Sequence, residues 1–343
     1  MGATGRMRAL GVSAAAGALL LTGCGDGGDG GGGSDESYSI GVTQIVSHPS
    51  LDEAREGFKQ AFEDAGIDVD WDEQNAQGDQ ATASNIAGTF ATSDLDLIHA
   101  VATPTAQAAA QQITDTPIVF SAVTDPEDAG LVDSMEEPGA NVTGASDLNP
   151  VHEQLELLQE IMPDAESVGV VYSSGEANSA VQVELLKEAA DELGLEVEEA
   201  TISASSEVQQ GVESLDADAI YVPTDNAVVS ALEAVLQYGQ QNDVPVVAAE
   251  GDSVVRGAVA TYGINYQQLG VQAGEMAIRI LEDGEDPADM PVETQEELEL
   301  YVNPDAAEEM GLEIPDEVTE RADVVVGDDV EPEDPAEAGE DEE

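Results

Sequence analysis

The order of apolar segments is the feature of this sequence that most limits its fold. From Tyr38 onward, short apolar segments alternate with longer segments whose apolar residues recur at helical spacing. The alternation runs once to about residue 126 and restarts near residue 152. Two successive strand–helix series predict an α/β fold with two doubly wound parallel sheets, one in each of two lobes. The expected strands are 38–46, 67–76, 95–102, 116–123, 167–174, 196–203, 218–225 and 244–251, and the expected helices are 50–66, 79–92, 104–113, 152–162, 179–194, 207–215 and 227–242.

Small, polar or glycine residues follow the expected strands in both series. The stretch VVYSSGEANS at 170–179 is an example, with a buried strand before it and a helix after it. Open α/β sheets bind ligands at this edge, and two such edges facing one another form a cleft. A chain of 343 residues with 41% hydrophobic residues is long enough for two cores. We therefore expect a ligand cleft between two lobes.

The charge balance excludes two classes of partner. The chain has 74 acidic and 8 basic residues, for a net charge of -66. Such a surface does not bind nucleic acid or anionic lipid through electrostatics. At molar salt the Debye length falls to about 3 Å, and the self-repulsion is largely screened. We interpret the acidity as a halophilic adaptation and a solvated surface.

The N-terminal segment has the features of a secretory signal. Arg6 and Arg8 precede an apolar stretch at 9–21 that is too short to span a bilayer but suits a signal-peptide core. The following Leu-Thr-Gly-Cys resembles a bacterial lipobox, in which the cysteine is lipidated. We therefore expect a lipoprotein signal peptide with Cys24, the only cysteine, as the lipidation site. The expected terminal segments are the signal peptide at 1–24, a flexible Gly/Asp tether at 25–37 and a disordered acidic tail at 327–343.

A long ordered series of local sequences resembles one protein family. The series includes QIVSHPSLDEAREGF at 44–58, ATPTAQAAAQ at 102–111, PIVFSAVTDPEDAGLV at 117–132, YSSGEANSAVQVELLK at 172–187, DAIYVPTDNAVVSALEAV at 218–235 and ATYGINYQQLGVQAGEMA at 260–277. From about residue 40 to about residue 315 the chain is similar to the ABC transporter substrate-binding protein family. Characterised members of that family include lipoproteins that bind tryptophan and other aromatic amino acids.

The resemblance implies the type I periplasmic-binding-protein fold, in which three crossing strands join two lobes. We place the crossings near 143–146, near 262–264 and within 297–305. Lobe one is then expected to comprise 38–144 plus 263–295, and lobe two 145–262 plus 296–326.

An amino acid, the ligand class that the resemblance favours, presents a carboxylate and an ammonium group. For the carboxylate, the helix start at Thr103 and Thr105 offers free backbone N–H groups, a positive dipole end and two hydroxyls. In lobe two the facing candidates are the Ser174 hydroxyl, the Gly175 backbone and the Asn178 amide.

For the ammonium group, the candidates are carboxylates at predicted strand ends, one in each lobe. These are Asp125 and Asp225, because a charge-assisted hydrogen bond to a buried ammonium group is of the stronger type. Gln44 and Glu250 also follow strands and are expected to face the cleft. The alternative for each of these residues is ordinary helix capping or turn formation.

The sequence lacks the common motifs of an enzyme. Walker A, Gly-x-Ser-x-Gly and His-Glu-x-x-His patterns are absent, and the three histidines show no metal-ligand spacing, so we expect no catalysis, metal or cofactor. We expect a monomeric lipoprotein, anchored on the extracytoplasmic face of the cell membrane, that captures a small solute by hinge closure and delivers it to ABC permease and ATPase subunits. An amino acid, tryptophan included, is the favoured solute. Two alternatives stay open: a ligand sensor that signals through a membrane partner and, with less support, an enzyme that uses cleft carboxylates.

Overall fold

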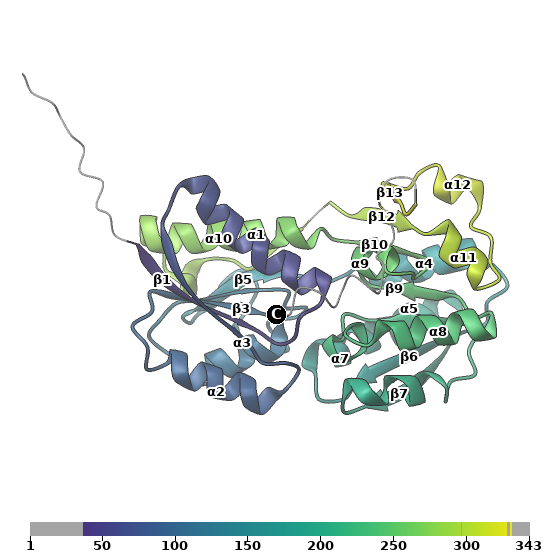
Figure 1. The fold of residues 1–343 in the computed structure, drawn as a ribbon, viewed down its shortest axis with the longest axis horizontal. Helices are drawn as coiled ribbons and strands as arrows, with labels where there is room; N and C mark the ends of the chain where they lie inside the picture. The colour runs from purple at the N-terminus through teal and green to yellow at the C-terminus, as the bar shows by residue number, and fades with distance from the viewer. Residues whose placement is uncertain (1–36, 296, 328–329, 331–343) are drawn as a thin grey trace, which may run out of the picture. The chain divides into compact units, whose positions relative to one another are not determined.

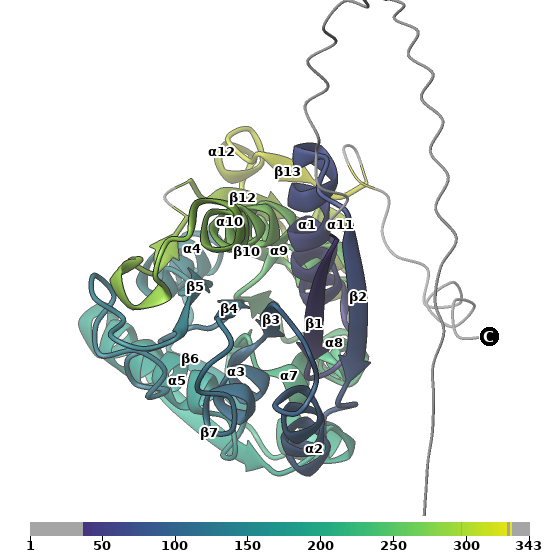
Figure 2. The ribbon, with the colours of Figure 1, turned by 90° about the vertical axis from the view of Figure 1, so that its left-hand side faces the viewer.

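The first lobe is built on a parallel sheet with the strand order β11-β5-β4-β3-β1-β2. The computed structural model describes residues 37–295, 297–327 and 330. The sheet strands are β1 (Tyr38–Gln44), β2 (Val69–Asn75), β3 (Leu97–Val101), β4 (Ile118–Ser121), β5 (Val142–Ser146) and β11 (Glu293–Thr294). Helices α1 (Pro49–Ala65) and α10 (Tyr266–Ile278) cover one face, and α2 (Gln80–Phe90) and α3 (Thr103–Ala110) cover the other (Figure 2).

The second lobe contains a parallel sheet ordered β7-β6-β8-β9 and a smaller sheet ordered β10-β12-β13, in which β10 and β12 are antiparallel (Figure 1). The strands are β6 (Ser167–Ser173), β7 (Glu196–Ile202), β8 (Ala219–Val222), β9 (Val246–Ala248), β10 (Ala260–Gly263), β12 (Glu299–Val302) and β13 (Val324–Val325). The helices are α4 (Val151–Ile161), α5 (Ala177–Leu193), α6 (Val208–Val212), α7 (Asn226–Val229), α8 (Leu232–Asn242), α9 (Gly251–Val255), α11 (Pro304–Glu309) and α12 (Asp316–Thr319). The shorter helical segments of the chain are η1 (Ser205–Glu207), η2 (Arg279–Asp283) and η3 (Pro287–Asp289).

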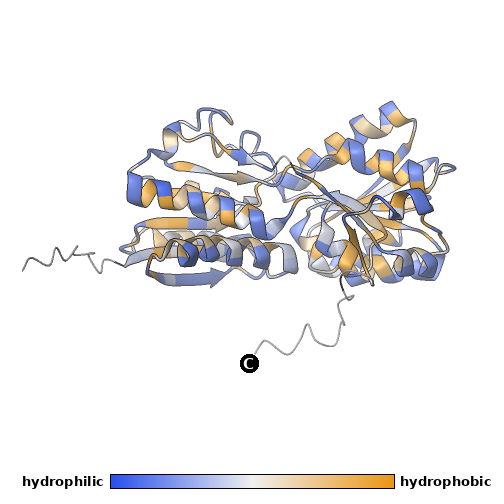
Figure 3. Cartoon of the chain, turned by 90° about the horizontal axis from the view of Figure 1, so that it is seen from above, coloured by the Kyte–Doolittle hydropathy of each residue, from blue (hydrophilic) through white to orange (hydrophobic). Residues whose placement is uncertain are grey.

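Each large sheet buries residues on both faces because successive side chains of a strand point in opposite directions. In β6, Val168 and Val170 belong to one apolar cluster, whereas Val171 belongs to the cluster on the other face. Strands β3 and β4 are buried along their whole length, as expected for a parallel sheet between two helical layers. Figure 3 shows hydrophilic residues on the outward sides of many helices and hydrophobic residues along the inner strands. The predicted α/β class is confirmed.

The chain crosses between the lobes at three places, and the first lies later than predicted. Strand β5 pairs with β4 as far as Ala145, so residues 143–146 still belong to the first sheet. The crossing therefore follows Ser146. The chain returns between β10 and α10 and crosses again between β11 and β12. Gln295 ties the last two crossings together: its Oε1 accepts from the Asn265 backbone N–H at 3.0 Å, and its Nε2 donates to the Asn265 carbonyl at 2.8 Å.

The single helix predicted over 227–242 is two helices in the structure. Asp225 begins α7, and its carboxylate accepts from the Val228 N–H at 2.9 Å. Ala231, with φ -123° and ψ 28°, then leaves the helical conformation before α8 begins. The apolar spacing runs through the break, so periodicity alone does not reveal it.

The terminal predictions fall mostly outside the described residues. These include the signal peptide, Cys24 and the tether as far as residue 36. The disordered tail was predicted to start at residue 327, but the Gly327 N–H donates to the Val330 carbonyl at 2.7 Å, and Val330 forms a β-bridge with the buried Val326. These contacts join Gly327 and Val330 to the end of the second lobe, and the rest of the predicted tail lies outside the described residues. Within 37–295, 297–327 and 330, none of the helices has both the length and the apolar character to cross a membrane.

Candidate ligand-binding site

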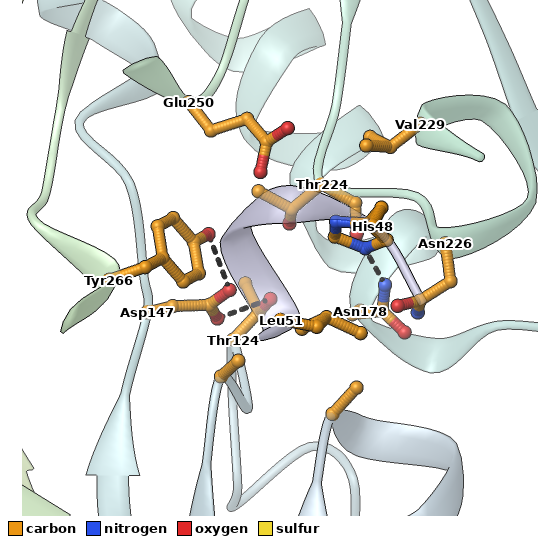
Figure 4. A pocket seen from close by; sticks show the side chains of 12 residues that line it. His48, Leu51, Thr124, Asp147, Asn178, Thr224, Asn226, Val229, Glu250 and Tyr266 are labelled. Carbon is orange, nitrogen blue, oxygen red and sulfur yellow. Dashed lines mark hydrogen bonds between the residues drawn. The ribbon is translucent and has the colours of Figure 1, made fainter. Parts of the chain in front are cut away.

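The candidate site is a pocket between the lobes, at the carboxyl ends of their strands. Its cavity volume is only about 10 Å³, room for about one water molecule, and side chains of both lobes converge on it (Figure 4). Parallel α/β sheets bind their ligands at this edge. From the first lobe and its crossings come His48, Leu51, Ala102, Ala122, Thr124, Asp147 and Tyr266, and from the second lobe come Asn178, Thr224, Asn226, Val229 and Glu250.

Asp147 lies on the first crossing and is buried. Its Oδ1 accepts from the Thr124 hydroxyl at 2.9 Å, and its Oδ2 accepts from the Tyr266 phenol at 2.9 Å (Figure 4). Burial raises the pKa of Asp147 to about 6; the charge of Glu250 adds to the rise, and the two hydrogen bonds oppose it. A cationic ligand group would therefore stabilise this carboxylate in its ionised form.

Glu250 follows β9 and is the second buried carboxylate of the pocket. The Ser253 hydroxyl donates to its Oε1 at 2.7 Å, and the Ser50 hydroxyl donates to its Oε2. Because Ser50 belongs to α1, the second of these hydrogen bonds joins the two lobes. Burial raises the pKa of Glu250, while both hydroxyls and, to a smaller extent, the Arg256 charge oppose the rise.

Two asparagine amides form part of the second-lobe wall. Asn178 Nδ2 donates to the Thr224 carbonyl at 2.9 Å and to Glu176 Oε2 at 3.2 Å. Asn226 donates to the same Glu176 oxygen through its backbone N–H, at 3.2 Å, and through its Nδ2. Glu176 is not part of the pocket lining, but its Oε2 accepts hydrogen bonds from both amides.

The pocket lining has no side chain that is positively charged at neutral pH. Burial and the Arg256 charge lower the pKa of His48 to about 4, so its imidazole is neutral. The Arg256 guanidinium points elsewhere: it donates to the Val229 carbonyl at 3.0 Å and pairs with Glu233 at 2.7 Å. The electrostatics of the lining therefore favour a ligand that carries a positive group.

Four of the residues predicted from the sequence lie at this pocket or at a second opening beside it. Asn178 and Glu250 line the pocket. Ser174 and Gly175 are exposed and line the wider opening between the lobes, where Gln80 of the first lobe donates to the Gly175 carbonyl at 2.8 Å. The turn at 173–176 thus contacts the opposite lobe, as its place at a strand end suggests.

Asp225, the second-lobe candidate for the ammonium partner, does not line the pocket. It is fully buried, and its Oδ2 accepts from the Ser173 N–H and from the Ser179 hydroxyl, each at 2.6 Å. The carboxylate therefore connects the end of β6, the start of α5 and the start of α7.

The other predicted residues also bond within their own lobe or lie away from the pocket lining. The Thr105 hydroxyl donates to the Val101 carbonyl at 2.5 Å, and Asp125 accepts from the Asp128 N–H at 2.9 Å. Gln44 lines a separate depression, where its Nε2 donates to Asp52 at 2.7 Å. Thr103 is buried in the first turn of α3 and is not part of the pocket lining. For Thr105 and Asp125 the observed bonds are those of the capping and turn alternative.

Sequence reasoning did not single out several polar residues that line the pocket. Thr124, Thr224 and Asn226 are direct neighbours of the two aspartates that it chose, in VTDP and PTDN. Asp147 and Tyr266 flank crossings. The available signal was position at a strand end or crossing, whereas the prediction gave more weight to the charge of a side chain than to its position.

Two doubly wound lobes with a pocket between their strand ends define a solute-binding protein of the type I periplasmic-binding fold. The family model described as ABC transporter substrate binding protein matches residues 39–326. The chain belongs to the ABC transporter substrate-binding protein family, as the sequence resemblance predicted, and it binds a small ligand.

The chain is similar to three proteins whose ligand or ligand-free state is known. A tyrosine-binding protein of Clostridioides difficile is 42% identical over 311 residues, which cover 87% of this chain and 90% of the relative. The ABC domain in complex with L-Trp from Streptococcus pneumonia is 35% identical, with a TM-score of 0.82 over 85% of this chain and 100% of that one. A ligand-free, open substrate-binding protein from Clostridium difficile is 45% identical, with a TM-score of only 0.64 over 84% and 99%. The lower structural agreement at higher identity indicates that the lobes are arranged more as in the L-Trp complex than as in the open protein.

Proposed function

We propose that this protein binds an aromatic amino acid of the tyrosine or tryptophan class between its lobes and delivers it to an ABC permease at the outer face of the cell membrane. The observation that carries the proposal is the pair of buried carboxylates, Asp147 and Glu250, in a lining without a cationic side chain. A buried carboxylate needs a charge partner or several hydrogen bonds. The α-ammonium group of an amino acid supplies both.

Neutral groups are available for the carboxylate of the ligand. The Thr224 hydroxyl and His48 Nδ1 are buried atoms without a hydrogen-bond partner among the described residues. Buried polar atoms are nearly always hydrogen-bonded, so both atoms point to a polar ligand. With no arginine in the lining, the ligand carboxylate would be held by neutral donors of this type.

Apolar lining groups suit the ligand side chain. Leu51, Val229 and the ring of Tyr266 face the pocket, together with two alanines. An aromatic ring gains from burial against aliphatic groups and from stacking or edge contacts with another ring. The tyrosine-binding relative and the relative solved with L-Trp support the same ligand class.

The lipoprotein and transport parts of the proposal rest on other observations. The lipobox-like sequence at Cys24 and the preceding apolar core support anchoring outside the cytoplasm. The family match supports a permease and an ATPase as partners. Uptake of labelled tyrosine by cells with and without the gene tests import, and unchanged uptake with retained binding would favour the sensing alternative.

Calorimetry on the purified protein at molar KCl tests the ligand class. Tyrosine and tryptophan are expected to bind once per chain, whereas glutamate, leucine and glucose serve as comparisons. Asp147→Asn and Glu250→Gln should each weaken binding about tenfold or more, since a hydrogen bond to a charged group contributes about 1.5–3 kcal/mol. Asp283→Asn, at an exposed position, is the matched control. Binding of glucose alone, or unchanged affinity in both pocket variants, would overturn the proposal.

A further inference from the structure

Glu176 is a buried carboxylate that lies behind the pocket wall and does not line the pocket. It is 9% exposed and borders the wider opening between the lobes. Its Oε2 accepts from Asn178 Nδ2 and from both the backbone N–H and the Nδ2 of Asn226. Both asparagines line the pocket. The side chain therefore acts on the pocket through two amides.

An ionised carboxylate only accepts hydrogen bonds, so each amide must turn its NH₂ group toward Glu176. The carbonyl oxygen is then the remaining polar atom of each side chain. Asn178 Oδ1 is buried without a partner in the described part of the chain, and Figure 4 shows the Asn226 amide directed toward Asn178 and His48. A neutral side chain at position 176 could both donate and accept, and the amides would lose this fixed orientation.

Capping of its own helix does not account for the placement of Glu176, although its bond to the Asn226 N–H also links it to the start of α7. Glu176 is the N-cap residue of α5, yet its side chain makes no capping hydrogen bond to the helix. Burial and the neighbouring Asp225 charge raise the pKa of Glu176 to about 7, so the side chain is an acceptor only once the pH exceeds about 7. Asp225 already connects the surrounding elements. Across the opening the first lobe contributes Asp79, and the nearby His48 is neutral.

We infer that Glu176 is a positioning residue that makes the second-lobe wall a hydrogen-bond acceptor, and that this polarity selects ligands with an ammonium group over analogues without one. The inference deepens the proposed function and rests on it for the identity of the ligand. Asn178 and Asn226 contact the ligand, and Glu176 determines whether each amide turns its carbonyl oxygen or its NH₂ group toward the ligand.

The test compares Glu176→Gln with Glu188→Gln, which removes an exposed charge from the same helix. The probes are L-tyrosine, L-tryptophan and 3-(4-hydroxyphenyl)propanoate, which is tyrosine without its amino group. In Glu176→Gln the affinity for both amino acids should fall about tenfold, and the affinity for the analogue should change less than about twofold, because only the acceptor polarity has been lost. An equal loss for all probes would indicate a structural role only, and no loss would also overturn the inference.

Side-chain NMR gives a readout that needs no ligand. In the ¹⁵N-labelled protein, the NH₂ signals of Asn178 and Asn226 should shift as the pH crosses about 7, where Glu176 titrates, and this shift should be absent in Glu176→Gln. Identical titrations in the two proteins would overturn the positioning role by themselves. If the wild-type protein binds neither amino acid, the proposed function and the ammonium selection both fail, whereas the NMR result still decides whether Glu176 orients the amides.

Discussion

Ser50 of the first lobe donates a hydrogen bond to Glu250 of the second lobe, and both side chains are fully buried by the contact between the lobes. Glu250 also lines the pocket, so the same carboxylate borders the pocket and contacts the opposite lobe. Separation of the lobes would remove the Ser50 hydroxyl from Glu250. We therefore expect ligand binding and closure to be coupled through this residue, since a ligand shifts an equilibrium only by contacts that differ between the two states.

Removal of the Ser50 hydroxyl should weaken ligand binding without unfolding the protein. In Ser50→Ala the closed form loses one hydrogen bond to a charged group, about 1.5–3 kcal/mol, so the affinity for tyrosine should fall about tenfold or more. Calorimetry measures the affinity, and small-angle scattering measures closure by the ligand. Ser93→Ala, at an exposed helix end, should match the wild type. Full affinity in Ser50→Ala would show that closure does not need this contact.

Asp147 should make the free energy of unfolding depend on pH between about 4 and 6. Its folded pKa of about 6 lies above the ordinary 3.8, so the folded protein binds the proton more tightly than the unfolded chain. The stabilisation is complete below about pH 4 and is lost as the pH rises through about 6. For a fully buried group this shift corresponds to about 3 kcal/mol.

Asp147→Asn should remove the contribution of Asp147 to the pH dependence of the free energy of unfolding. Urea unfolding at constant high salt should show the variant gaining up to about 3 kcal/mol relative to the wild type between pH 4 and pH 7. The comparison isolates Asp147 from the other acidic groups, which titrate in both proteins. Parallel pH profiles for the two proteins would contradict the raised pKa.

Asp225→Ala should destabilise the second lobe. The substitution leaves the Ser173 N–H, the Ser179 hydroxyl and the Val228 N–H without their acceptor in a buried site. Loss of such a buried network costs about 3–5 kcal/mol. Urea denaturation at high salt measures the loss. Asp125→Ala, in a half-buried turn, should cost less than about 1 kcal/mol. A stable Asp225→Ala protein with specifically reduced affinity would restore Asp225 as a ligand contact.

Glycine at position 270 should be required for the close packing of α10 on α1. A Cβ at Gly270 would lie 2.0 Å from the Ala54 carbonyl oxygen, and backbone cannot move aside as a flexible side chain can. Gly270→Ala should therefore cost about 3 kcal/mol of unfolding free energy, measured by urea denaturation. Gly88→Ala is the contrasting case, because its Cβ would meet only the flexible Gln112 side chain, and helix propensity should stabilise it by up to about 1 kcal/mol. Equal effects of the two substitutions would contradict the packing argument.

The strands and helices were largely predictable because their signals are local. The mostly apolar segment at 97–101 and the spacing of apolar residues through 49–65 are properties of neighbouring residues, and burial of those residues forms β3 and α1. The break before α8 was not predictable, since the apolar spacing continues across Ala231 while its backbone leaves the helix. The crossing expected near 143–146 follows Ser146 for a related reason, because pairing with β4 as far as Ala145 and with β11 at Ser146, rather than any local pattern, keeps these residues in the first sheet.

The sequence by itself determined the α/β class, the order of the elements, the family and the edge of the sheets where a ligand would bind. Only the tertiary structure decided which polar side chains line the pocket between the lobes. Asp147 and Asp225 are the same residue type near strand ends, yet backbone and hydroxyl groups of the second lobe surround Asp225, while Asp147 on a crossing faces the pocket. The physical reason is that a carboxylate bonds to whichever donors the packed fold brings within reach, and most of those donors are distant in the chain.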